Sequence, residues 1–345
     1  MSDCLSLERN QGAVFQTSLA GGHLAHMTLS KADGADEAAD FVINSAAQIS
    51  KIIGFGGALT DATAINVIYS YNAVVDDFEM KYFSIDVDKT STSNKLAFIN
   101  PKVLLVSLGP LLKAKHPDVE LIIMDDQKSL MPSWNGALQD PEARQYVDGV
   151  SAHWYMNLDF VSKTAGNFAE MSNWQQANPD LFNLAMEACE GYLIEGLGTG
   201  AGTKLLQPEM VWKRGEVYAR DIVNDLANYA TGWMDWNLVL DTKGGPTWVE
   251  SNVDSPILVD EVDKIEFYKQ SMYYVMGHFS KFQPPGSVRV KLELSVNAAA
   301  ALVTVDRVAF FTPGNQVVFV LHNRDTTKKV VRIDLASKGR SCKAM

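Results

Sequence analysis

Short apolar stretches alternate with helical stretches over most of the chain, and the apolar stretches predict buried strands. The first runs from Ile52 into a glycine-rich turn at Gly54-Phe55-Gly56-Gly57, and an apolar helix follows to about Tyr69. The same pattern recurs at 119–124, 147–152, 181–186 and 229–233. Strands that alternate with helices predict a parallel sheet in an α/β fold. Because polar and aromatic residues collect where these strands end, the pattern favours a (β/α)8 TIM-type barrel.

A different pattern begins after Pro284-Pro285-Gly286. The segments 288–294, 301–311, 316–321 and 329–335 alternate between apolar and polar residues and end in turns, which is typical of antiparallel strands. Near the N-terminus, Phe41-Val42-Ile43 is the one short strand that we expect. We therefore predict a barrel domain at 51–282 and an all-β sandwich module formed by residues 1–50 together with 283–345.

Composition and charge exclude several classes of protein. Hydrophobic residues make up 47% of the 345 residues and charged residues 21%, so the chain is not disordered. The formal net charge of -11 argues against a general nucleic-acid binder. The start of the sequence has no pattern of a signal peptide, and no uncharged apolar run reaches the roughly 18 residues that suggest a membrane span. The three cysteines have no CxxC spacing, which argues against a zinc ribbon.

Two strand ends carry candidate site residues. Glu187 ends the apolar strand at 181–186, where a carboxylate is costly to bury unless it is paired or catalytic. The alternative for Glu187 is a salt bridge at the barrel rim. His153-Trp154-Tyr155 ends the preceding strand, where the cluster could stack on a sugar or position a carboxylate. The alternative is that His153 is a buried core residue whose hydrogen bonds are all made within the protein. The residues around it in the sequence do not have the spacing of metal ligands.

A glycine-rich stretch gives a weaker signal. Gly196-Leu197-Gly198-Thr199-Gly200-Ala201 matches the loose GxGxxA dinucleotide pattern. A true fingerprint must open a helix at the glycines, and Pro208 argues against a regular helix start there. We expect a flexible loop.

Longer motifs resemble one known family, the glucosylceramidases (acid β-glucosidases) of glycoside hydrolase family 30. The resemblance covers most of 51–290. It is carried by Gly54-Phe55-Gly56-Gly57-Ala58-Leu59-Thr60-Asp61-Ala62, Met124-Asp125-Asp126-Gln127, His153-Trp154-Tyr155, Glu187-Ala188-Cys189, Gly232-Trp233-Met234-Asp235-Trp236-Asn237-Leu238 and Gly277-His278-Phe279-Ser280-Lys281-Phe282.

The resemblance implies an activity and a site. Members of the family are lysosomal in animals and hydrolyse the β-glucosidic bond of glucosylceramide with retention, in sphingolipid metabolism. Glu187 matches the nucleophile, and Trp236 matches an aromatic residue of the glucose pocket. Substrate-binding positions are also expected at Tyr155, His153, Asp61 and Asn237. The resemblance implies no cofactor and no metal ion. Expected partners are glucosylceramide at a membrane surface and a saposin-type activator protein, and no nucleic acid.

The chain departs from the family in its first half. The family carries its acid/base glutamate in an Asn-Glu-Pro motif after the fourth strand, and this motif is absent from the 345 residues. The Arg-Val-Pro segment of the second strand is absent as well. We therefore expect an incomplete barrel with strands two to four largely missing. The segment 72–108, with 103–108 as a partial third strand, is left to cover the gap. Asp125 and Asp126 are the nearest substitutes for the missing acid.

The surviving strands are neighbours in a closed barrel, in the spatial order five, six, seven, eight, one. We expect Asp61, Tyr155, Glu187 and Trp236 to line one groove. The leading hypothesis is a glucosylceramidase-like retaining β-glucosidase that is impaired by the loss of the acid/base segment. The alternatives are a non-catalytic glycolipid-binding remnant or pseudoenzyme, and a related β-glycosidase with another substrate. A second carboxyl group near Glu187 would discriminate between the enzyme and the non-catalytic protein.

Overall fold

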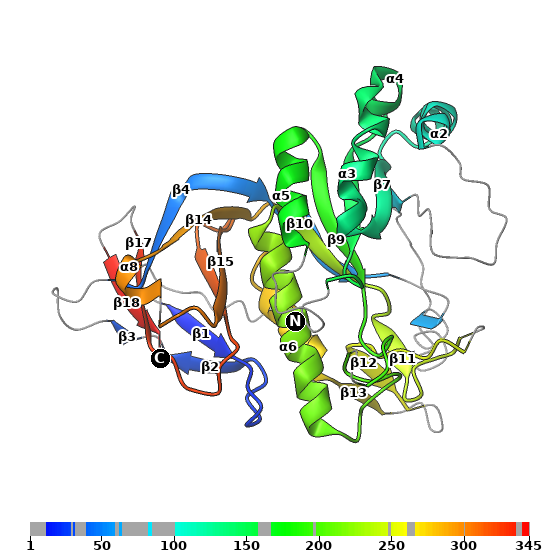
Figure 1. Ribbon diagram of the computed structural model, residues 1–345. Coiled ribbons are helices and arrows are strands. Elements are labelled where there is room, and N and C mark those ends of the chain that lie inside the picture. Colours follow the sequence, from blue (N-terminus) through cyan, green and yellow to red (C-terminus); the bar gives the residue numbers. More distant parts are fainter. Residues whose placement is uncertain are drawn as a thin grey trace. The chain divides into compact units, whose positions relative to one another are not determined.

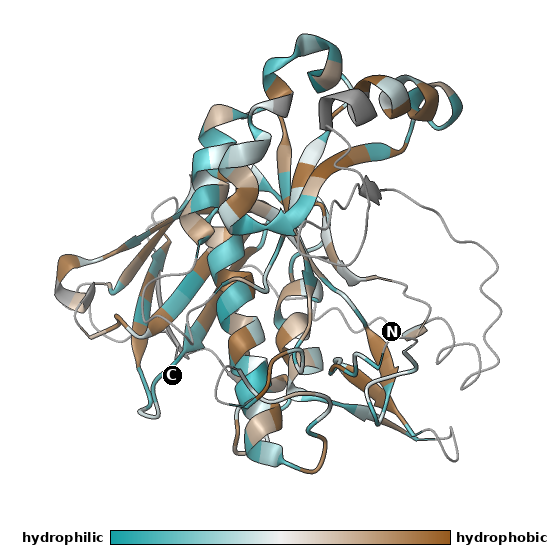
Figure 2. Cartoon of the chain, turned by 45° about the vertical axis from the view of Figure 1, so that its right-hand side comes forward, coloured by the Kyte–Doolittle hydropathy of each residue, from teal (hydrophilic) through white to brown (hydrophobic). Residues whose placement is uncertain are grey.

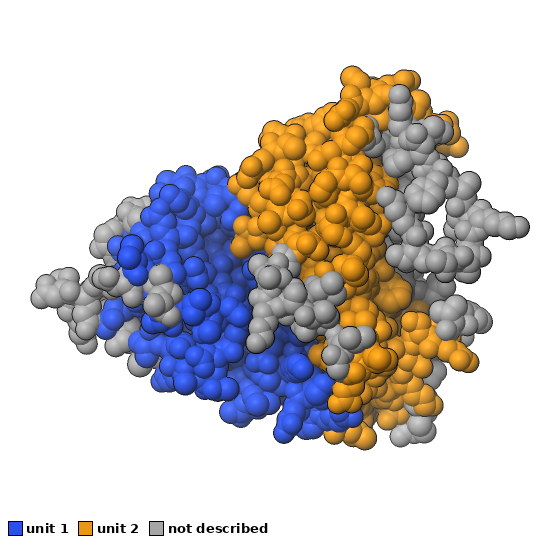
Figure 3. All heavy atoms as spheres, viewed as in Figure 1, with its two compact units in different colours: residues 1–54, 207–224, 270–345 blue, residues 55–206, 225–269 orange. Residues whose placement is uncertain are grey.

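The computed structural model divides into two compact units, which are coloured separately in Figure 3. It describes residues 12–28, 30–31, 39–58, 62–63, 82–84, 101–157, 167–195, 198–247, 250–260, 266–299, 301–335 and 340–344. Unit 1 comprises residues 1–54, 207–224 and 270–345, and unit 2 comprises 55–206 and 225–269. The predicted domain boundaries stay a prediction.

A six-stranded sheet forms the centre of unit 2, in the order β5-β10-β9-β8-β7-β6 (Figure 1). The paired neighbours from β10 to β6 all run parallel. The strands are β5 (Gly54–Gly57), β6 (Tyr82–Ser84), β7 (Glu120–Gln127), β8 (Gly149–His153), β9 (Phe182–Ala188) and β10 (Ala230–Asp235). The predicted spatial order of the surviving strands is therefore confirmed, and so is the incomplete barrel.

The interior strands of this sheet are apolar for most of their length. In β7, Leu121, Ile122, Ile123 and Met124 are buried. Figure 2 shows hydrophobic stretches along these strands. Close packing reaches the backbone at Gly149, where an added Cβ would lie 2.5 Å from the ring of Phe182. Strands buried on both faces read as continuous hydrophobic runs, which is why the sequence located them correctly.

Helices and a small second sheet complete unit 2. The helical elements are α2 (Pro101–Lys115), η1 (Lys128–Leu130), α3 (Met131–Trp134), η2 (Ala137–Gln139), α4 (Pro141–Arg144), α5 (Phe168–Ala177) and part of α6 (Pro208–Ala227). The small sheet has the order β11-β12-β13, with β11 (Val239–Asp241), β12 (Ile257–Val259) and β13 (Phe267–Lys269). The expected loop at the glycines lies partly outside the described residues, at 196 and 197, and the next helix, α6, begins only at Pro208.

The expected strand at 103–108 is wrong, because these residues lie inside the helix α2. A short apolar run cannot be assigned to strand or helix by periodicity alone. Here the run is part of a 15-residue helix that starts at Pro101 and has Lys113 and Lys115 in its last turn. A proline at a helix start and lysines near its end both favour the helix.

Unit 1 contains a seven-stranded sheet in the order β16-β15-β14-β4-β17-β18-β3 and a two-stranded sheet, β1-β2. Its elements are β1 (Ala13–Gln16), β2 (Ala25–Thr28), β3 (Ser30–Lys31), β4 (Phe41–Lys51), most of α6, α7 (Ser271–Ser280), β14 (Val288–Leu294), α8 (Val296–Ala299), β15 (Val305–Phe311), β16 (Val317–Asn323), β17 (Val331–Leu335) and β18 (Arg340–Ala344). Segments from both ends of the chain therefore pair in one sheet.

The strand near the N-terminus is longer than predicted. β4 has 11 residues, and it pairs antiparallel with β14 and parallel with β17. Only Phe41 and Ile43 are buried in it. Its second half is mostly polar or half-exposed, so the hydrophobic pattern fades there while pairing on the β14 side continues to Lys51. Within the described residues, no helix is long and apolar enough to cross a membrane.

Candidate active site

The carboxyl ends of β7, β8 and β9 bring three side chains together. Asp125 lies in β7, His153 ends β8, and Glu187 lies one residue before the end of β9. Because these strands are parallel neighbours, their carboxyl ends meet at one edge of the sheet. The backbone is unusual at both acids, with φ of 47° at Asp125 and 57° at Glu187. Non-glycine residues held at positive φ cost free energy and cluster at functional sites.

A hydrogen-bonded chain links these three side chains. His153 Nε2 lies 2.9 Å from Asp125 Oδ1 and 3.0 Å from Glu187 Oε2. Asp125 Oδ1 also accepts a hydrogen bond of 3.0 Å from Ser151 Oγ. The His153 and Asp125 side chains are 7% and 9% exposed, whereas the Glu187 side chain is 26% exposed. Of the three hydrogen-bonded side chains, Glu187 is therefore the one that a substrate can reach.

Two carboxylates keep His153 protonated. Burial alone lowers the pKa of this imidazole, but hydrogen bonds and charge interactions with Asp125 and Glu187 raise it from 6.5 to about 10. The two carboxylates share the one hydrogen on Nε2 of the imidazolium, whose positive charge leaves neither acid as an uncompensated buried charge.

This raised pKa predicts a pH dependence of stability. Between pH 6.5 and about 10 the folded protein holds a proton on His153 that the unfolded chain has lost. The stability that protonated His153 contributes is therefore complete below pH 6.5 and disappears as the pH rises through about 10. We expect the free energy of unfolding, measured by urea denaturation, to fall across this range more steeply for the wild type than for His153→Gln. Parallel pH profiles would contradict the assignment.

Tyr155 flanks the nucleophile candidate, and Tyr192 packs on Tyr155. Tyr155 OH lies 3.5 Å from Glu187 Oε1, which is long for a hydrogen bond, and 3.7 Å from Cys189 Sγ. Burial, with the neighbouring Cys189 and Glu187, raises the pKa of the Tyr155 phenol well above its usual range. The phenol therefore stays a hydrogen-bond donor. Tyr192 OH donates to the Tyr155 carbonyl oxygen at 3.2 Å, and the two rings meet edge to face at 4.8 Å.

The other predicted site residues follow the next strand, β10. The Trp236 amide donates to the Ala188 carbonyl oxygen at 2.9 Å, and the Asn237 amide donates to Asp235 Oδ1 at 2.8 Å. Trp236, Tyr155 and Tyr192 pack against a buried cluster that includes Cys189. Asp61 lies outside the described residues. The structure thus brings His153, Tyr155, Glu187 and Trp236 to one edge of the sheet, and their functional roles stay predictions.

Sequence reasoning identified Asp125 only as a substitute acid and missed its contact with His153. Ser151 and Tyr192 were not identified at all. Asp125 could have been linked to His153 from the spatial strand order, since β7 and β8 are neighbours and both residues lie at strand ends. Nothing in the residue pattern marked Ser151, which is fully buried within β8.

The same three side chains offer ligand atoms that could hold a metal ion. Atoms of Asp125, His153 and Glu187 lie within 4.8 Å of one another, and two carboxylates with an imidazole form a common donor set. However, the distances of 2.9 and 3.0 Å from Nε2 are those of charge-assisted hydrogen bonds. We therefore describe the cluster as a hydrogen-bonded chain.

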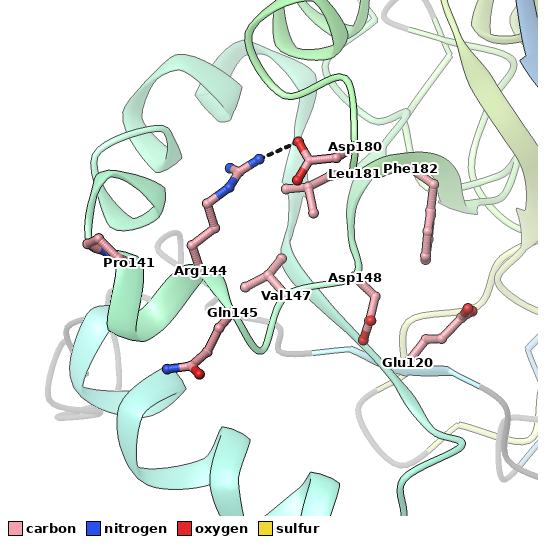
Figure 4. A pocket seen from close by; sticks show the side chains of 9 residues that line it. All are labelled: Glu120, Pro141, Arg144, Gln145, Val147, Asp148, Asp180, Leu181 and Phe182. Atoms are coloured by element: carbon pink, nitrogen blue, oxygen red, sulfur yellow. Dashed lines mark hydrogen bonds and ion pairs between the residues drawn. The ribbon is translucent and has the colours of Figure 1, made fainter.

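A separate cavity of about 610 Å³ lies at the opposite ends of these strands (Figure 4). Glu120 begins β7 and Phe182 begins β9, and both line the cavity. Two of its acidic groups are paired, with Arg144 on Asp180 at 2.5 Å and Lys113 on Asp148 at 2.7 Å. In barrels of this kind the amino-terminal face contributes stability and the carboxyl-terminal face carries the chemistry. The cavity is therefore not the candidate active site.

Comparisons with known proteins give the family. Residues 102–283 match the glycosyl hydrolase family 30 TIM-barrel domain, and residues 286–344 match the family's β-sandwich domain. The chain is 40% identical over 220 residues to lysosomal acid glucosylceramidase of Mus musculus, which is 64% of this chain and 39% of that protein. It is also 40% identical over 201 residues to putative glucosylceramidase 3 of Caenorhabditis elegans, covering 57% of this chain and 35% of that protein.

The chain thus spans about two fifths of the length of these curated relatives. Among solved structures, SrfJ from Salmonella typhimurium has a TM-score of 0.75 at 15% identity, over 97% of this chain and 96% of that one. The endo-β1,6-glucanase BT3312 has a TM-score of 0.69 at 16% identity, over 96% and 98%. At such low identity these two structures show the fold alone. With the matches to both family domains, the chain belongs to glycosyl hydrolase family 30.

Proposed function

We propose that this protein is a glucosylceramidase-like retaining β-glucosidase whose nucleophile is Glu187, and that its catalysis is impaired. The observation that carries the proposal is the environment of Glu187. Its Oε2 is held by His153 at 3.0 Å, and its Oε1 lies near the Tyr155 phenol on the partly exposed side of the chain. A carboxylate fixed in this way can attack the anomeric carbon of a β-glucoside and form a covalent glucosyl-enzyme.

The attack also needs a carboxylic acid that protonates the leaving oxygen and then, as a carboxylate, activates the water that hydrolyses the glucosyl-enzyme. Asp125 has an oxygen within 4.8 Å of a Glu187 oxygen, close to the roughly 5–5.5 Å separation of retaining enzymes. However, His153 Nε2 bridges the two carboxylates, and Ser151 also donates to Asp125. The position that the sugar would occupy between an acid and a nucleophile is therefore taken by an imidazole. Asp125 is not placed to act as the acid.

Apolar side chains support a lipid as the leaving group. Met156 follows Tyr155 in the chain and is 44% exposed, and Ile194 follows Tyr192 by two residues and is 64% exposed. Exposed apolar side chains that follow site residues in the chain suit the hydrocarbon of a ceramide better than a second sugar. The mouse relative is named a lysosomal glucosylceramidase. We therefore propose a glycolipid substrate at a membrane surface and a lysosomal location, and a saposin-type activator stays a prediction.

The missing acid predicts a strong dependence on the leaving group. A 2,4-dinitrophenolate leaves without protonation, whereas a ceramide alkoxide does not. Acid catalysis is typically worth about 10²–10⁴-fold. We therefore expect the ratio of the glucosylceramide rate to the 2,4-dinitrophenyl β-glucoside rate to be lower than in a complete family member by this factor. The measurement compares initial rates on both substrates for the purified 345-residue chain and a complete homologue. Equal ratios would show that an acid is present.

A second candidate function, a non-catalytic glycolipid-binding protein, is favoured by the bridging position of His153. It predicts that glucosylceramide binds with Trp236 and Tyr155 against the sugar, while Glu187 never becomes glucosylated. A fluorosugar that traps the glucosyl-enzyme distinguishes the two candidates, because only a reactive Glu187 gains its mass.

A further inference from the structure

We propose that Asp125 is a positioning residue for the nucleophile, which it orients through His153. The inference rests on the proposed function in one respect, namely that Glu187 is the nucleophile. Asp125 itself does not contact the position of the substrate, since His153 Nε2 lies between the two acids.

The structure holds Asp125 firmly in place. Its side chain is buried, its backbone φ is 47°, and its Oδ1 accepts hydrogen bonds from Ser151 Oγ and His153 Nε2. The β7–β8 register shifts between Met124 and Asp126, so a bulge in β7 turns this residue towards β8. A carboxylate in such surroundings requires a cationic partner, because an unpaired buried charge is costly.

Fixing Asp125 also fixes the proton on His153. The titratable groups that face this imidazole are Asp125 from β7, Glu187 from β9 and the Tyr155 ring, which is edge-on at 6.0 Å. The Asp125 carboxylate, 2.9 Å away, keeps the hydrogen on Nε2, and Glu187 Oε2 at 3.0 Å shares this hydrogen with Asp125. Glu187 is then restrained at Oε2, and Oε1 is the oxygen that is left to attack a sugar.

Removal of the Asp125 charge should therefore weaken the hydrogen bond between His153 and Glu187, although Asp125 does not itself donate to Glu187. In Asp125→Asn the imidazole loses one of its two anionic partners and gives up its proton at a lower pH. The amide group of asparagine can also donate to Nε2, which favours the tautomer that has no hydrogen on this atom. A lone pair of Nε2 would then face Glu187 Oε2, and the two acceptors would repel each other.

The first measurement is the NMR titration of the His153 imidazole, which requires no enzymatic activity. We expect the wild type to titrate at about pH 10 and Asp125→Asn at least one pH unit lower. Asp125→Glu keeps the charge and should restore most of the shift. Asp180→Asn removes a charge at the opposite end of β9 and should behave as the wild type. Titration of wild-type His153 near its ordinary value of 6.5 would overturn the inference even if no variant folds.

The second measurement is the rate at which 2,4-dinitrophenyl 2-deoxy-2-fluoro-β-glucoside labels Glu187, as a function of pH. We expect Asp125→Asn to label at least tenfold more slowly than the wild type above the pKa of its own His153, and to approach the wild-type rate below that pKa. Identical labelling profiles for the two proteins would disprove the positioning role. If the wild type is not labelled at all, the proposed function fails, and the titration alone decides whether Asp125 controls the charge of His153.

Discussion

Replacing Glu187 with glutamine will abolish the glucosyl adduct and lower the hydrolysis of 2,4-dinitrophenyl β-glucoside by about 10³-fold or more, equivalent to about 4 kcal/mol of transition-state stabilisation. The reason is that a neutral amide cannot form the covalent bond to the anomeric carbon. The substitution preserves the shape of the side chain, so the contacts around it change little. This is the largest effect on activity that we expect.

Intact mass spectrometry after reaction with the fluorosugar measures the adduct, and peptide mapping locates it. Glu195 provides the matched control, because it lies in the loop that follows β9 and is exposed. Glu195→Gln should be labelled as fast as the wild type. An adduct on another carboxylate, with Glu187 unmodified, would refute the assignment of the nucleophile.

Replacing Lys128 with alanine will destabilise the protein by about 3–5 kcal/mol, because it removes the cationic group that pairs with the buried Asp225 carboxylate. Lys128 Nζ lies 3.0 Å from Asp225 Oδ1, and these side chains are 1% and 0% exposed. The ammonium group also lies 5.2 Å from the centre of the Phe168 ring. Lys128 follows β7 directly, so this ion pair anchors the chain just after Asp125.

Urea denaturation measures this loss. Lys291 is the control, since its pair with Glu293 is 2.6 Å long but the two side chains are 56% and 55% exposed. Lys291→Ala should cost about 0–1 kcal/mol. The double variant Lys128→Met with Asp225→Leu removes both charges and should recover most of the stability that Lys128→Ala loses. A cost of Lys128→Ala similar to that of Lys291→Ala would contradict a tight buried pair.

The sequence predicted the parts of the fold that depend on burial. Strands β7 to β10 are apolar on both faces, so their existence and their order could be worked out from hydrophobic runs and family motifs. The second half of β4 could not be predicted, because it is half-exposed and is held by pairing with a strand more than 200 residues away. The short strands β11, β12 and β13 were missed, since three-residue strands carry too little pattern.

The candidate site was predicted residue by residue but not as a network. Strand ends and motifs identified Glu187, His153, Tyr155 and Trp236. The link from Asp125 to His153 depends on a bulge in β7 and on positive φ at Asp125, and neither has a signature in the residue types. The His153 proton that two carboxylates share depends on residues from three strands, β7, β8 and β9.

The order of the six-stranded sheet has a consequence for engineering. Strand β9, which carries Glu187, has two strands on one side and three on the other. Both strands that pair with β9 are therefore interior strands of the sheet. Among the described residues, β5 and β6 are the outermost strands of this sheet, and they are also consecutive along the chain. One inserted segment between Gly57 and Tyr82, carrying the strands that the family places there, could pair with both edges at once. A single graft could thus close the barrel and supply an acid opposite the proposed nucleophile, Glu187.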